Sequence, residues 1–208
     1  MSRTTESETR DKEGLQETLS SEDEALPALA RIAVETFVRQ RRTLEAQAAP
    51  PSPLLQQKAA CFVSIKTHRG DLRGCIGTIE PAKPTLAEEL IANAVSAATR
   101  DPRFFPVTEA ELSGLRYSVD VLSEPEPAQF EDLDPSIYGL IVEDESGLHR
   151  GLLLPDIEGV ETAAQQVDIA ARKAGITPGT PLRFFRFRVR RYREPARFQT
   201  DNAQGANQ

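Results

Sequence analysis

The 208-residue sequence has no tryptophan, two cysteines and two histidines, and these shortages exclude several classes of protein. Cys61 and Cys75 are too few for a disulfide framework or an all-cysteine metal site. We therefore predict two free thiols in a reducing compartment. His68 and His149 do not make a histidine-rich metal centre, so we predict no metal site.

Long hydrophobic runs are also missing. The longest, such as 119–122 and 151–154, fall far short of the roughly 18 residues that span a membrane. Residues 1–10 lack the apolar segment of a secretory signal, so we expect a cytoplasmic protein without a membrane segment. The sequence has no phosphate loop, no dinucleotide fingerprint, no Cys-x-x-Cys and no His-Glu-x-x-His, so we predict no cofactor.

The net charge of −7 is concentrated at the start of the chain. Residues 1–24 hold eight acidic and three basic side chains, a net of −5, which leaves −2 for the rest. A nearly neutral body exerts no long-range attraction on nucleic acid or anionic membranes. Because residues 1–22 lack a hydrophobic period, we predict a disordered acidic tail there, a folded domain over 25–198 and a flexible tail over 199–208.

Apolar residues spaced three and four apart predict amphipathic helices. The predicted helices cover 26–44, 86–100 and 161–174, with a short helix at 108–115. Thr85 and Glu88 have the spacing of an N-terminal capping box, and Gly175 is suited to end the third helix.

Segments with period-two alternation predict strands. These segments are 61–67, 72–79, 117–123, 139–143, 148–154 and 182–192. Residues 68–71 and 144–147 have the composition of hairpin turns. Hairpin-linked strands with helices outside them favour an α+β fold, mainly an antiparallel sheet with flanking helices, over a doubly wound parallel sheet.

The most informative stretch is Leu72-Arg73-Gly74-Cys75-Ile76-Gly77-Thr78. A turn centred on residues 69 and 70 predicts three cross-strand pairs: Lys66 opposite Arg73, Ser64 opposite Cys75, and Phe62 opposite Gly77. One sheet face then carries Lys66, Arg73, Ser64 and Cys75. The other face, which includes Cys61 and Leu72, is expected to be core.

Two interpretations of Cys75 follow from this register. Beside Arg73 and Lys66, two positive charges would favour the thiolate and make it a better nucleophile. Alternatively, cysteine is a small, often buried residue that fills a gap beside two glycines. No histidine is spaced to act as the base that a nucleophile needs.

The two glycines are equally ambiguous. Glycine weakens a strand, so Gly74 and Gly77 mark a bulge or a close approach by ligand or backbone. Phe62 covering Gly77 would be an ordinary packing contact.

The heptapeptide 72–78 resembles the signature of the AMMECR domain family, called AmmeMemoRadiSam system protein A in prokaryotes. The resemblance covers about residues 27–198. Further matches follow in the expected order: Asp101-Pro102-Arg103-Phe104, Val119-Asp120-Val121-Leu122 leading into 124–127, Gly151-Leu152-Leu153-Leu154-Pro155, and Lys173-Ala174-Gly175.

The resemblance implies a compact α+β fold of two joined subdomains with a cleft near the signature strand. It also implies joint action with a MEMO-like protein and a radical SAM protein. Asp101 and Arg103 either present their side chains at the mouth of the cleft or belong to a rigid helix stop made by Pro102. The sequence departs from the family after Pro155, where the chain is shorter and lacks tryptophan.

Three functions are compatible with these residues. The first is an accessory protein that binds a partner or a small anionic ligand, with Arg73 on the anion, Lys66 beside it, and Gly74 and Gly77 admitting the ligand. The second is an enzyme with Cys75 as nucleophile. The third is RNA binding through residues 183–193, where six arginines alternate with aromatic residues.

We rank the accessory function first, because the sequence supplies no complete catalytic set. Nucleic acid is the least favoured partner, since the same arginine pattern is typical of the charged outer face of a half-buried strand.

Overall fold

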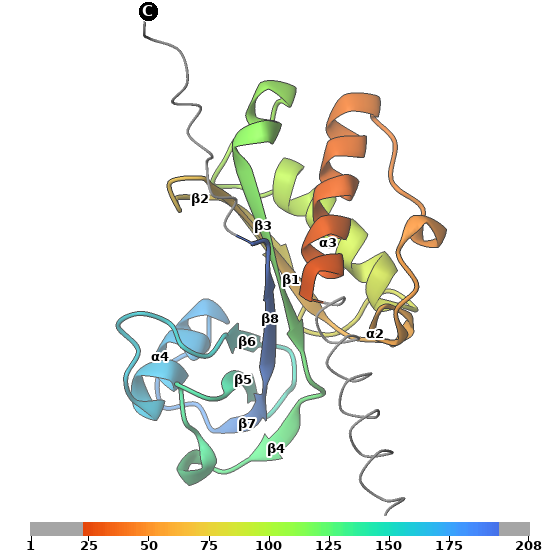
Figure 1. Ribbon diagram of the computed structural model, residues 1–208. Coiled ribbons are helices and arrows are strands. Elements are labelled where there is room, and N and C mark those ends of the chain that lie inside the picture. Colours follow the sequence, from red (N-terminus) through yellow and green to blue (C-terminus); the bar gives the residue numbers. More distant parts are fainter. Residues whose placement is uncertain (1–22, 196–208) are drawn as a thin grey trace, which may run out of the picture.

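The computed structural model describes residues 23–195 and contains two four-stranded antiparallel sheets with helices packed on them (Figure 1). The predicted α+β class is confirmed. The tails predicted at 1–22 and 199–208 lie outside the described residues. No helix in the range 23–195 is long and apolar enough to cross a membrane.

The described elements are the N-terminal helix (23–40), the 3-10 helix η1 (Ala46–Ala48), α2 (Pro53–Gln56), β1 (Cys61–Thr67), β2 (Leu72–Gly77), α3 (Leu86–Thr99), the 3-10 helix η2 (Glu109–Gly114), β3 (Leu115–Leu122), β4 (Glu126–Ala128), the 3-10 helix η3 (Phe130–Asp132), β5 (Gly139–Asp144), β6 (Arg150–Leu153), α4 (Ala163–Lys173), β7 (Leu182–Phe187) and β8 (Val189–Arg193). The first sheet, sheet A, has the order β2-β1-β3-β8. The second, sheet B, has the order β4-β7-β5-β6.

Helix α3 and the N-terminal helix cover one face of sheet A (Figure 1). Thr85 caps α3 by accepting a hydrogen bond from the Glu88 amide at 3.3 Å, as the capping-box spacing predicts. The predicted apolar stripe of α3 is buried against β1 and β2. The helix ends just before Pro102, because the residue before a proline leaves the helical region.

Helix α4 packs on sheet B in the same manner. Thr162 and Gln165 form its capping box, and Gly175, with φ +69°, follows its end in the left-handed conformation that glycine favours. At Gly151 on β6, an added Cβ would lie 2.1 Å from the Ala170 carbonyl oxygen of α4. Glycine therefore sets the contact distance between α4 and its sheet.

The segment predicted as one strand at 182–192 forms two strands in different sheets. β7 belongs to sheet B and β8 to sheet A, with Arg188 between them. The Arg188 amide donates to Ser123 Oγ at 3.0 Å, and the Ser123 amide donates to the Arg188 carbonyl at 2.9 Å. The prediction failed because the apolar alternation continues through Arg188 into a core that both sheets share.

Strand β4 was not predicted. Its central residue, Pro127, cannot donate to a ladder, and β4 lies at the edge of sheet B, where proline is tolerated.

The predicted hairpin register is correct for two of its three pairs. Phe62 lies opposite Gly77 and Ser64 opposite Cys75, but Lys66 lies opposite Leu72 rather than Arg73. A β-bulge causes the difference, because Arg73 is the extra residue of β2. Leu72, predicted to be core, is instead exposed.

Gly74 is expected to be essential for the packing of α3 on β2. An added Cβ would lie 2.2 Å from the Ala97 carbonyl oxygen, which belongs to helix backbone and cannot rotate away. Gly74→Ala should therefore destabilise the fold by about 1–3 kcal/mol in urea unfolding. Gly114→Ala is the matched control, since no atom lies within 4 Å of that position. Equal stability of the two variants would contradict this account.

Candidate functional site

The outer edge of β2 is closed by the turn that follows α3. Asp101 Oδ2 accepts a hydrogen bond from the Cys75 amide at 2.8 Å, and the Asp101 side chain is 2% exposed. The Arg103 side chain pairs with the same carboxylate and lowers the pKa of Asp101 well below its usual range. These contacts agree with the interpretation of this turn as a rigid helix stop. The Asp101 carboxylate accepts the hydrogen bond that the Cys75 amide would otherwise donate to a neighbouring strand.

Arg73 is held by protein partners. Its guanidinium donates to both carboxylate oxygens of Glu111, at 2.7 and 3.2 Å, and to the Phe105 carbonyl at 3.0 Å. The hydrogen bond from Arg73 lowers the pKa of Glu111 to about 2. The predicted anion-binding group is thus already neutralised by a carboxylate, with its side chain only 16% exposed.

The end of the signature is attached to α3. Thr78 Oγ1 donates to Glu89 Oε1 at 2.5 Å, and the Lys83 amide donates to the other oxygen at 2.7 Å. An added Cβ on Gly77 would lie 2.3 Å from the Phe62 ring, as the packing interpretation expected. Together with the contact at Gly74, these interactions show that most of the heptapeptide fixes β2 in place.

The face of sheet A turned away from the helices is polar, and we call it the Cys75 face. Its members come from four adjacent strands and lie in two cross-strand rows. The first row is Cys75, Ser64, Ser118 and Arg193, and the second contains Lys66 and Arg116. Ser64 Oγ donates to Cys75 Sγ at 3.2 Å.

Three cations of the Cys75 face have no carboxylate partner among residues 23–195: Lys66, Arg116 and Arg193. Within the described residues, the one hydrogen bond of the Arg116 side chain is to His68 Nδ1, at 3.1 Å. Lys66 and Arg116 are direct cross-strand neighbours, and like charges at such positions destabilise a sheet. A bound anion would remove this repulsion.

Two further arginines lie near the signature strand, and both are paired with carboxylates. Arg191 pairs with Asp120 at 2.6 and 2.9 Å, and Arg103 pairs with Asp101. Arg103 also reaches the Cys75 carbonyl at 3.5 Å. Like Arg73, both guanidinium groups are therefore neutralised by a neighbouring carboxylate.

Neither histidine in the described part of the chain is placed as a base for Cys75. His68 Nε2 lies 2.9 Å from the Ser113 carbonyl, and its other ring nitrogen accepts from Arg116. His149 pairs with Asp144 in the β5–β6 hairpin. Within the same residues, no group of His, Cys, Asp and Glu side chains is arranged to hold a metal ion.

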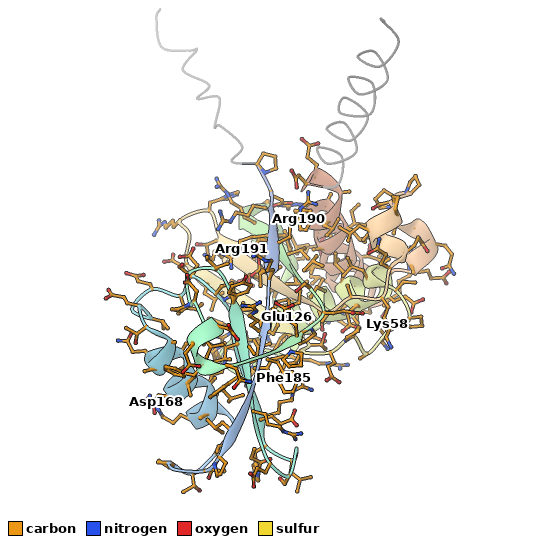
Figure 2. The ribbon with its side chains drawn as sticks, turned by 90° about the horizontal axis from the view of Figure 1, so that it is seen from below. Lys58, Glu126, Asp168, Phe185, Arg190 and Arg191 are labelled. Carbon is orange, nitrogen blue, oxygen red and sulfur yellow. The ribbon has the colours of Figure 1, made fainter. Side chains whose placement is uncertain are left out.

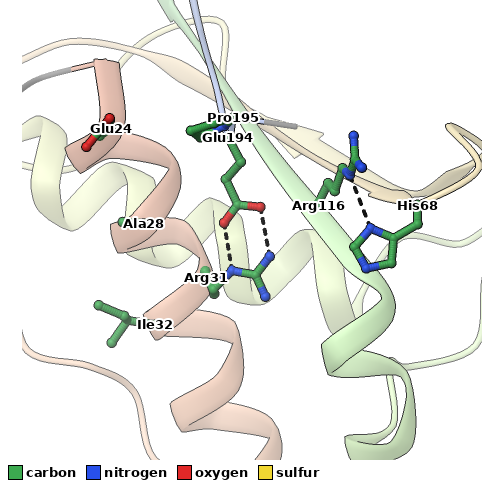
Figure 3. A pocket seen from close by; sticks show the side chains of 8 residues that line it. All are labelled: Glu24, Ala28, Arg31, Ile32, His68, Arg116, Glu194 and Pro195. Atoms are coloured by element: carbon green, nitrogen blue, oxygen red, sulfur yellow. Dashed lines mark hydrogen bonds and ion pairs between the residues drawn. The ribbon is translucent and has the colours of Figure 1, made fainter. Parts of the chain in front are cut away.

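The end of the Cys75 face at Arg116 adjoins a pocket of about 370 Å³ between the N-terminal helix and β3 (Figure 3). Arg31 pairs with Glu194 in this pocket and donates to the Leu115 carbonyl at 2.8 Å. Glu194 in turn accepts from the Tyr117 amide. The Arg31 and Glu194 side chains thus provide hydrogen-bond partners for backbone groups at the edge of β3, beyond the end of β8.

The predicted site residues are thus divided between two locations. Lys66 and Cys75 share the polar face, and Arg103 reaches Cys75 from the edge. Arg73, Gly74, Gly77 and Asp101 hold β2 against the rest of sheet A. Whether any of these residues binds a ligand stays a prediction. Sequence reasoning missed Arg116, Ser118 and Arg193, because they join the face only through the order of β1, β3 and β8.

Comparison with known proteins gives the family. The AMMECR1 family model matches residues 27–194, which include both sheets. This chain belongs to the AMMECR1 family. The family suggested by the heptapeptide is therefore confirmed.

Relatives of this AMMECR1 domain occur in bacteria and archaea. A protein of Thermotoga maritima is 46% identical over 162 residues, which cover 77% of this chain and 92% of that protein. A Clostridium acetobutylicum protein is 49% identical over 137 residues, which cover 66% of this chain but 29% of that longer protein. The crystal structure of an uncharacterised protein from Pyrococcus horikoshii matches with a TM-score of 0.70 and 29% identity, covering 82% of this chain and 95% of that one.

The Arg73–Glu111 pair should make stability depend on pH. The pKa of Glu111 is lowered from 4.5 to about 2, so its contribution is complete above pH 4.5 and is lost as pH falls toward 2. The difference in unfolding free energy between wild type and Glu111→Gln should shrink over that range in urea titrations. In an Arg73→Ala background most of this trend should disappear. A difference that stays constant from pH 6 to pH 3 would contradict the pairing.

The two thiols should react very differently. Cys61 is fully buried, and burial raises its pKa to about 12, whereas Cys75 is partly exposed. Iodoacetamide at pH 8 should add one group to the native protein, at Cys75, and a second only after unfolding. Intact-mass measurement on wild type and Cys75→Ser tests this. Rapid labelling of native Cys75→Ser would refute the assignment.

Proposed function

We propose that this AMMECR1-family protein is an accessory binding protein that holds a small anionic ligand on the Cys75 face. The observation that carries the proposal is a set of three cations, Lys66, Arg116 and Arg193, that have no carboxylate partner in the described part of a chain that is acidic overall. We further propose that it acts with a MEMO-like protein and a radical SAM protein, as its resemblance to the family implies.

The chemistry of the Cys75 face suits a carboxylate or a phosphate group. Arginine offers a planar fork of donors and lysine a compact charge, and both bind these anions. The hydroxyl groups of Ser64 and Ser118 lie between the cations and can donate further hydrogen bonds. The register of β1, β3 and β8 places these side chains on one face before a ligand arrives.

A cysteine-dependent enzyme is the second candidate. The partly exposed Cys75 thiol on the polar face, with the Ser64 hydroxyl donating to its sulfur at 3.2 Å, supports this candidate. The lack of a nearby base among the described residues weighs against it. Full activity of Cys75→Ser in a reconstituted system would exclude covalent catalysis by this residue.

RNA binding is the third candidate and has the least support. Four of the six arginines at 183–193 pair with carboxylates: Arg183 with Glu143, Arg186 with Glu126, Arg190 with Asp23 and Arg191 with Asp120. These pairs support a structural role for the alternating arginines.

Titration calorimetry with inorganic pyrophosphate at low ionic strength tests the proposed site. Wild type should bind, and Lys66→Ala or Arg193→Ala should each weaken binding about tenfold, which corresponds to roughly 1.4 kcal/mol for one charged contact. Arg69→Ala, in the exposed β1–β2 turn, is the matched control and should bind like wild type.

Equal affinities for all four proteins would overturn the assignment. A repeat with the purified MEMO-like protein present tests the partnership, since coupled binding must change the ligand affinity. An unchanged affinity would show that the two events are independent.

A further inference from the structure

A second recess lies at the junction of the two sheets, on the side of sheet A opposite the Cys75 face. Its volume is about 740 Å³, and it is lined by the segments 57–60, 79–81 and 121–125 together with the start of β8. We call it the junction groove. Successive residues of β8 separate the two sites: Arg190 lines the groove, whereas Arg191 points to the other face and pairs with Asp120 (Figure 2).

The walls of the junction groove are largely apolar. Val121 and Leu122 at the end of β3 are nearly buried, and Ile79 and Val189 are half-buried beside them. Such a recess between two subdomains, with apolar walls and few polar groups, is the usual form of a small-molecule site.

Several hydrogen-bond donors line the groove. Among residues 23–195, the exposed Lys58 side chain makes no ion pair or hydrogen bond, and the backbone amides of Lys58 and Ala59 donate no hydrogen bond. Arg190 lies over the Tyr192 ring at 4.9 Å, with a long contact of 3.5 Å to Asp23. Of the two acids that line the groove, Glu80 is neutralised by Arg150, and Glu124 lies on the exposed rim.

We propose that the junction groove binds a small organic acid with an apolar body. The acid group lies on Lys58 and the adjacent amides, and the apolar body covers Val121, Leu122 and Val189. An ammonium group with two free amides matches a carboxylate or sulfonate, while the apolar walls exclude a bare inorganic anion as the preferred ligand. This site is independent of the proposed function of the Cys75 face.

The test uses 8-anilinonaphthalene-1-sulfonate, an aromatic sulfonate, in fluorescence titrations of the full chain. Lys58→Glu should weaken its binding at least tenfold, whereas Arg69→Glu, the same charge reversal in the β1–β2 turn, should leave it within twofold of wild type. The uncharged analogue N-phenyl-1-naphthylamine should bind wild type and Lys58→Glu alike, because it lacks the acid group.

Near-ultraviolet circular dichroism confirms that each variant is folded. Equal sulfonate binding by wild type and Lys58→Glu would overturn the proposal. Pyrophosphate affinity should persist in Lys58→Glu, which separates the groove from the Cys75 face. A loss of both affinities in the folded variant would contradict two independent sites.

Discussion

The close approach of β2 to α3 at Gly74 is the contact on which the geometry of sheet A depends. The Ala97 carbonyl occupies the space that a side chain would need, and Asp101 then closes the outer edge of β2 through the Cys75 amide. Because β2 is fixed by these two contacts, the Cys75 side chain points to the polar face of sheet A. Most residues of the signature heptapeptide therefore fix the position of β2, and one of them, Cys75, places its thiol beside Ser64.

Sheet B packs on its helix through the same kind of glycine contact. Gly151 meets the Ala170 carbonyl of α4, as Gly74 meets that of Ala97 on α3. The two halves are joined where the chain crosses between the sheets, and Ser123 and Arg188 hold these two crossings together. The two crossings lie next to each other. The apolar residues around Ile141 and Phe187 there form a core that both sheets share, and the junction groove lies beside this core.

The ion pairs separate the cations of the two sheets into those neutralised by a carboxylate and those that are not. Most arginines of β7 and β8 meet carboxylates across neighbouring strands, so their charges are neutralised at the surface. On the Cys75 face, Lys66, Arg116 and Arg193 have no carboxylate partner within residues 23–195, although the like charges of Lys66 and Arg116 on paired strands are unfavourable. The proposed binding function rests on this arrangement, because a bound anion would reduce the repulsion.

The sequence by itself determined the α+β class, the helix caps at Thr85 and Gly175, and the pairing of Ser64 with Cys75, because these follow from local patterns of residues. The family followed from the resemblance of the heptapeptide to a known signature. The sequence could not show the bulge at Arg73, whose side chain contacts Glu111 and Phe105, residues that are distant in the chain. Nor could it show the change of sheet at Arg188, because the apolar alternation is the same on both sides. The order of β1, β3 and β8 was decided only by tertiary packing, and that order places Arg116, Ser118 and Arg193 on the same face as the thiol.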